Sequence, residues 1–199
     1  MPGLAEVLEG PILQVAPRLL GAVVSHTTAE GTVAVRLTEV EAYAGYEDPG
    51  SHAFRGPTRR NEVMFGPPGH LYVYFAYGMH FCANVVCGEP GRASAVLLRA
   101  GEVVEGIDLV KVRRGSARDR DLARGPARLC SALGIDLSHN GLDLRAGALT
   151  LCPRDQPHRP ERISTGPRVG LRPAADHPWR FWLTDEPTVS AYRPAKKLT

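Results

Sequence analysis

The sequence predicts an α+β fold, in which a curved and mainly antiparallel β-sheet is surrounded by helices and long loops. Residues 32–43 alternate between apolar and polar positions in the manner of a long strand. Two further strand patterns, 71–76 and 80–87, are joined by a tight turn, as in a β-hairpin. Because helical patterns flank these strands, we expect helices packed against one sheet. With 199 residues, the chain suits a single domain over 1–199.

The amino-terminal part of the chain predicts a helix, a strand and a loop, in that order. The helix covers residues 12–24, and Gly21 weakens its end. In the strand at 32–43, the strict alternation places valines, a leucine, two glutamates and a tyrosine on the same face. Residues 44–70 are rich in glycine, proline and charge, which indicates a long loop of the kind that often carries function.

The rest of the chain predicts shorter elements. Strands are expected at 71–76, 80–87 and 95–100, and a helix at 126–133 has proline at its start and Gly134 at its end. Residues 152–178 are rich in proline and arginine, which favours loop. Closing strands are expected around Phe181, Leu183 and Val189.

Composition limits the classes of function. The net charge of +3 and the isoelectric point of 8.8 permit a polyanionic partner without requiring one. The chain shows neither a secretory signal nor a membrane span, so we expect a cytoplasmic protein with no membrane partner. The four cysteines are few and irregularly spaced, which predicts reduced, buried thiols and neither a zinc site nor another metal site. They are Cys82, Cys87, Cys130 and Cys152.

Two acidic residues of the long strand are candidates for chemistry. Glu39 and Glu41 follow an apolar run on the predicted strand face, where a carboxylate is partly desolvated and needs a partner. Either acid could be a structural member of an ion pair, or a general base tuned by burial and a nearby cation. Arg99, inside an apolar strand pattern, needs an anion, which could be Glu41, Glu39 or a phosphate.

Aromatic residues and one amide mark the hairpin that follows. Tyr72 and Tyr74 share a strand face, an arrangement that most often serves sheet packing. Tyr77 lies at a glycine-flanked turn, where an exposed ring could insert into stacked bases. Asn84 is poorly suited to a strand interior, and its amide could be satisfied by the sheet backbone or have a functional role.

Separated blocks of the chain resemble one enzyme family. The blocks are Glu39 to Tyr43, Glu47-Asp48, His52, Arg59-Arg60-Asn61, Met64-Phe65, Pro68 to Tyr74, Tyr77-Gly78-Met79, Asn84, Leu97 to Ala100, Gly125 to Cys130 and Arg162 to Val189. In this order they are similar to the alkyladenine (3-methyladenine) DNA glycosylases, and specifically to bacterial members. The likeness runs from about residue 10 to 193 and is far more specific than a short motif.

The resemblance implies a monofunctional enzyme of base excision repair, which flips a damaged purine out of duplex DNA and hydrolyses its N-glycosidic bond. In the implied roles, Glu41 is the general base for the attacking water and Arg99 orients that water. Tyr43, His52 and Tyr74 would sandwich the base, while Asn84 would reject guanine. The remaining implied pocket and DNA-intercalating residues are Leu97, Tyr77 and Met79.

The expected partner is double-stranded DNA that carries damaged purines, in the bacterial cytoplasm at the nucleoid. No cofactor is expected, and a monomer is expected because DNA must cover one face. Arg59, Arg60 and Arg114 are candidate contacts to the DNA backbone, the last from a basic segment at 111–128 that could equally be a solvated face.

Three alternatives remain open. A binding module could recognise lesions without cutting, and would need the aromatic residues and cations but not Glu41. A Schiff-base glycosylase would need an amine, and the chain offers no lysine in the pocket blocks, although removal of Met1 would expose the secondary amine of Pro2. Structured RNA could also be a substrate.

Overall fold

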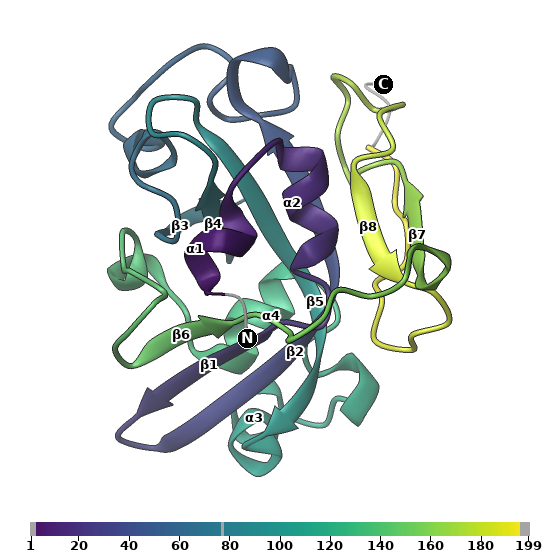
Figure 1. The fold of residues 1–199 in the computed structure, drawn as a ribbon. Helices are drawn as coiled ribbons and strands as arrows, with labels where there is room; N and C mark the ends of the chain where they lie inside the picture. Colours follow the sequence, from purple (N-terminus) through teal and green to yellow (C-terminus); the bar gives the residue numbers. More distant parts are fainter. Residues whose placement is uncertain (1–2, 77, 196–199) are drawn as a thin grey trace.

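A computed structural model describes residues 3–76 and 78–195, and these form one eight-stranded antiparallel sheet with helices around it (Figure 1). The strand order is β3-β4-β5-β2-β1-β6, and β8 also pairs with β2 and carries β7 at its outer edge. The strands are β1 (Val23–Thr28), β2 (Gly31–Ala44), β3 (Leu71–Ala76), β4 (His80–Cys87), β5 (Ser94–Glu105), β6 (Leu149–Cys152), β7 (Ile163–Gly166) and β8 (Arg180–Leu183).

Four α-helices lie within the described residues, together with short 3-10 turns. The helices are α1 (Leu4–Leu8), α2 (Ile12–Arg18), α3 (Ile107–Arg114) and α4 (Pro126–Leu133). Helix α4 packs on β4 and β5, and α2 packs on β2 and β5. Both helices bury apolar side chains in one continuous core with the sheet. The predicted α+β class and curved antiparallel sheet are confirmed, while a single domain over 1–199 stays a prediction because it includes residues outside the described ranges.

The sequence patterns predicted the bounds of some helices and strands correctly and those of others wrongly. Strands β3 and β4 and helix α4 have the predicted bounds, and β2 and β5 are longer than predicted. The predicted 12–24 helix is wrong: α2 ends at Arg18, and residues from Val23 onward form β1. Gly21 causes this break, because its φ of 81° is left-handed and its N–H donates to Leu37 in β2 rather than along a helix.

Several other expectations need correction. Part of the 152–178 segment forms β7, which pairs with β8, and Val189 lies in no strand. The basic segment begins with helix α3, which was not expected. Cys152 is exposed, whereas the other three cysteines are buried as predicted.

The two central strands, β2 and β5, carry a matched pair of bulges. The register slips at Thr38 in β2 and slips back at Arg99 in β5, so each of these residues is an extra member of its strand. Because both strands shift together, their side chains exchange faces at the same level of the sheet.

The exchange corrects the predicted faces of β2. The strict alternation placed Glu39 and Glu41 on the same face as the valines that precede them, and this is wrong. After the bulge the glutamates lie on the face opposite the main core, although both remain fully buried. The core-facing residues of β2 are Val33, Val35 and Leu37 before the bulge, and Val40 and Ala42 after it.

No helix among the described residues is long and apolar enough to cross a membrane. Within the same residues, no group of three or more histidine, cysteine or acidic side chains is placed to hold a metal ion.

The close approach of β2 and β5 beside the bulge makes Gly101 a sensitive position. A Cβ atom at Gly101 would lie 2.5 Å from the carbonyl oxygen of Arg36, so the two strands would have to separate. We expect Gly101→Ala to lower the free energy of unfolding by about 1–3 kcal/mol, measured by urea denaturation. Gly3→Ala is the control, because a Cβ there meets nothing within 4 Å. Equal stability of the two variants would contradict the close packing.

Candidate active site

A pocket of about 490 Å³ opens on the face of the sheet to which the bulge turns the glutamates. Strands β2 to β5 form its floor, and segments near residues 50 and 170 form its sides. The structure brings together in this pocket all seven residues that the sequence assigned to catalysis or base binding. These are Glu41, Tyr43, His52, Tyr74, Asn84, Leu97 and Arg99.

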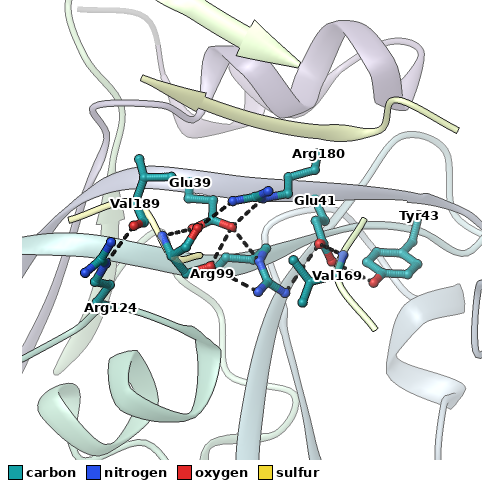
Figure 2. A network of polar contacts seen from close by, with 9 residues as sticks. Glu39, Glu41, Tyr43, Arg99, Arg124, Val169, Arg180 and Val189 are labelled. Atoms are coloured by element: carbon teal, nitrogen blue, oxygen red, sulfur yellow. Dashed lines mark hydrogen bonds and ion pairs between the residues drawn. The ribbon is translucent and has the colours of Figure 1, made fainter. Parts of the chain in front are cut away.

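The carboxylate of Glu41 is fully buried and held by two hydrogen bonds and one ion pair (Figure 2). Its Oε1 accepts a 2.7 Å hydrogen bond from the backbone N–H of Val169 and lies 3.3 Å from Nη1 of Arg99. Its Oε2 accepts a 2.9 Å bond from the hydroxyl of Tyr43. Burial, followed by the charge of Glu41, raises the pKa of Tyr43 well above its usual value, so the hydroxyl stays protonated and donates.

This arrangement leaves one acceptor position on Glu41. A carboxylate oxygen has two lone pairs. Oε1 accepts from the N–H of Val169 and also faces the guanidinium of Arg99 at 3.3 Å. Among the described residues, Tyr43 is the one donor to Oε2, so the second lone pair of this oxygen is open to the pocket. A single bound water could donate a proton to that position.

Arg99 connects Glu41 to a second buried carboxylate. Its Nε donates to Oε1 of Glu39 at 2.7 Å, and Nε of Arg180 donates to the same oxygen at 2.7 Å. The N–H and the hydroxyl of Ser190 also donate to Glu39, at 2.6 and 2.9 Å. Burial alone would raise the pKa of Glu39, but Arg99 and Arg180 outweigh burial and hold it below its usual value. Glu39 is therefore ionised at neutral pH.

Aromatic rings line the sides of the pocket. The ring centroids of His52 and Tyr74 lie 4.5 Å apart at a steep angle, and Nδ1 of His52 lies 3.1 Å from the hydroxyl of Tyr72. Partial burial, and then the charge of Arg60, lower the pKa of His52, which favours the neutral imidazole at neutral pH. Burial raises the pKa of Tyr74 well above its usual value, so its ring stays a neutral phenol.

Asn84 and Leu97 form a cross-strand pair of β4 and β5 on the pocket floor. Asn84 is buried, and its amide nitrogen donates to the carbonyl of Tyr72 at 3.1 Å. The sheet backbone thus satisfies part of the amide, as one of the two sequence interpretations expected. The same bond fixes the orientation of the side chain in the pocket.

The other predicted contact residues lie in different surroundings. Met79 directly precedes β4, in the connection from β3, and is 69% exposed. Tyr77 lies outside the described residues. Arg60 lies at the pocket, 5.6 Å from the centroid of the Tyr74 ring, whereas Arg114 lies on α3 and donates to the carbonyl of Leu122. Arg59 is exposed in the 51–66 loop.

Sequence reasoning missed a buried ion pair that supports the pocket. Nη2 of Arg168 donates to Asp48 at 2.7 Å, and Nη1 donates to the carbonyl of Ala42 at 2.9 Å. The guanidinium also lies 4.6 Å from the centroid of the Tyr43 ring. Because Arg168 precedes Val169, this pair fixes the backbone N–H that holds Glu41. No periodicity marks Arg168, which lies in a polar, proline-rich stretch.

We expect Asp48→Asn to lower the free energy of unfolding by about 3–5 kcal/mol, because it leaves a buried guanidinium without its counter-ion. Urea denaturation measures the change. Asp143→Asn is the control, since it breaks a 2.7 Å pair with Arg145 at the surface and should change stability far less. Similar losses in the two variants would contradict a special contribution from the buried pair.

Comparison with known proteins identifies the family of the chain. A relative from Streptomyces avermitilis is 56% identical over 193 residues, which cover 94% of this chain and 90% of the relative. One from Leifsonia xyli subsp. xyli is 58% identical over 191 residues, or 91% and 88% of the two chains. One from Mycobacterium tuberculosis is 47% identical over 199 residues, or 97% and 95%. All three are provisionally named as 3-methyladenine DNA glycosylases.

The sequence profile of one family, methylpurine-DNA glycosylase, matches residues 6–187. This match covers most of the chain, including every pocket residue. The chain therefore belongs to the methylpurine-DNA glycosylase family.

Proposed function

We propose that this DNA glycosylase is monofunctional: it extrudes a damaged purine from duplex DNA, hydrolyses the N-glycosidic bond with an activated water and leaves an abasic site. The observation that carries the proposal is the open acceptor position on the buried Glu41, at the floor of an aromatic pocket. The proposed substrates are purines of the 3-methyladenine, 7-methylguanine, hypoxanthine and ethenoadenine classes. The names of the relatives support the first of these.

In the proposed mechanism, Glu41 acts on both the sugar and the attacking water. Cleavage of a glycosidic bond passes through a sugar with oxocarbenium-like positive charge, which a nearby carboxylate stabilises. Oε2 of Glu41 accepts the proton of the water that attacks the sugar. Arg99, 3.3 Å from the other oxygen, orients the carboxylate and the water. The proposed reaction uses no metal or organic cofactor.

Aromatic stacking offsets the cost of extruding the base. Unstacking a nucleotide costs a few kcal/mol, and stacking on aromatic walls returns about 1–3 kcal/mol per base. Tyr43, His52 and Tyr74 supply these walls in the proposal. Electron-rich rings also favour purines that carry the positive charge of an alkyl lesion. Tyr77 and Met79 are proposed to fill the space that the extruded nucleotide leaves.

The proposed partner is double-stranded DNA, bound by a monomer in the bacterial cytoplasm at the nucleoid. Arg59, Arg60 and Arg114 are proposed to contact phosphates. The position of Arg60 at the pocket supports a contact beside the lesion. Such contacts make affinity fall with rising salt concentration.

We expect Glu41→Gln to abolish base release while affinity for lesion DNA is retained, because the amide keeps the shape of the side chain but cannot take a proton. Duplex oligonucleotides with a single hypoxanthine, ethenoadenine or 3-methyladenine measure the reaction in the absence of added metal. Alkali then reveals abasic sites. Release within about tenfold of the wild-type rate would rule out Glu41 as the general base. Lesion binding without release by the wild type would instead favour the binding module.

Asn84→Ala should admit guanine and increase its release from duplex DNA, because the substitution removes the side chain proposed to crowd the exocyclic amino group. Release of guanine and of hypoxanthine would be compared for the variant and the wild type. Ser138→Ala, a polar-to-alanine change at an exposed turn, serves as the control. An unchanged ratio of the two rates in Asn84→Ala would remove the proposed selective role of this residue.

A further inference from the structure

We propose that Glu39 is a positioning residue for the reaction: it holds the Nε edge of Arg99, and so keeps that arginine from closing over the proton-accepting oxygen of Glu41. The inference rests on the proposed function. It concerns a buried carboxylate to which the mechanism above gives no part, two residues before Glu41 on the same face of β2.

Glu39 itself is not placed to meet substrate or water in the pocket. It is fully buried, and its two oxygens accept from Arg99, from Arg180, and from both the N–H and the hydroxyl of Ser190. It also does not line the pocket. Glu39 can therefore act on the reaction only through the groups that it holds.

The position of Arg99 shows what Glu39 controls (Figure 2). Nε lies 2.7 Å from Glu39, whereas the nearest contact to Glu41 is 3.3 Å, from Nη1. Arginine prefers to bind a carboxylate with two parallel N–H donors. Glu39 occupies Nε, and the Ser190 hydroxyl, which itself donates to Glu39, accepts from Nη2 at 3.3 Å. Arg99 therefore reaches Glu41 with Nη1 alone and leaves Oε2 to Tyr43 and the pocket.

Charge balance stabilises the arrangement in which Arg99 is shared between Glu39 and Glu41. The buried cluster holds two carboxylates, Glu39 and Glu41, and two guanidinium groups, Arg99 and Arg180. Its formal charge is thus zero. Without the charge of Glu39, the cluster would hold the cations Arg99 and Arg180 with the single charged carboxylate of Glu41. Arg99 would then bind Glu41 with two N–H donors instead of one.

Loss of the Glu39 charge should impair the chemical step of the reaction and not the binding of the lesion. A two-donor pair of Arg99 with Glu41 would fill the lone pair that the water needs. It would also stabilise the ionised carboxylate and make it a weaker base. The aromatic sides of the base pocket would stay intact, because no hydrogen bond or ion pair joins Glu39 to Tyr43, His52 or Tyr74. The chemical step should therefore fail while lesion binding survives.

The test is Glu39→Gln, which removes the charge and keeps the size. We expect its single-turnover rate of base release to fall by about 10- to 100-fold, with lesion-DNA affinity within about threefold of wild type. The acid limb of the rate–pH profile should also move to lower pH, because an extra cationic contact favours the ionised base.

The pH profile depends on the charged and polar groups that face Glu41. These are Arg99 from β5, Tyr43 from β2, Tyr74 from β3, Cys82 from β4 and the N–H of Val169.

Glu186→Gln is the matched control. Glu186 is a mostly buried carboxylate, 3.0 Å from Arg36 and outside the pocket, so the same chemical change there tests for a general loss of stability. Its rate and its pH profile should both match wild type. If Glu39→Gln does not fold, Glu39→Asp keeps the charge but withdraws it from Arg99, and should show the same fall in rate with retained affinity.

The outcomes separate this inference from the proposed function. Absence of base release by the wild type would overturn the proposed function itself. Release by the wild type, with a folded Glu39→Gln or Glu39→Asp that matches its rate, would overturn the positioning role alone. So would a fall in rate that is matched by an equal loss of affinity, with no movement of the acid limb, because that is the pattern of structural damage.

Discussion

The site depends on the division of one buried guanidinium between two carboxylates. Arg99 binds Glu39 closely with Nε and touches Glu41 with Nη1, and all three side chains are almost wholly removed from water. Buried charges are tolerated only when they are paired and hydrogen-bonded, so each member of this cluster requires the others. Arg180 completes the pairing and attaches β8 to the network. The result is a carboxylate that is ionisable, held in one orientation, and still open on one side.

The geometry of the sheet makes this division possible. With uninterrupted alternation, Glu41 would lie among the core residues of β2, where no pocket exists. The paired bulges at Thr38 and Arg99 exchange the faces of both strands. The apolar residues of β2 before the bulge therefore face the core, and the glutamates after it lie on the face that carries the pocket. The bulge therefore links the fold to the chemistry, and the close contact at Gly101 lies directly beside it.

Local patterns in the sequence predict the hairpin of β3 and β4 and helix α4, because each is recorded in short-range alternation or in turn and capping residues. The composition of the pocket was implied by the resemblance of separated blocks to one enzyme family. Local patterns do not predict the bulge, since the pattern of β2 reads as strict alternation and the register slip depends on β5. The buried contacts of Asp48, Arg168 and Ser190 were missed for a related reason. These residues lie in irregular segments, and their partners are far away in the chain, so burial alone distinguishes them from surface polar residues.

The central claim is that water, activated by Glu41, is the nucleophile, and trapping with borohydride during turnover tests it most directly. The amine that could compete is that of Pro2, exposed if Met1 is removed, since the described pocket is lined by no lysine. An enzyme that uses water forms no Schiff base with the sugar. The account therefore predicts complete base release and no protein–DNA adduct after reduction. A covalent adduct that forms at the rate of base release would contradict it.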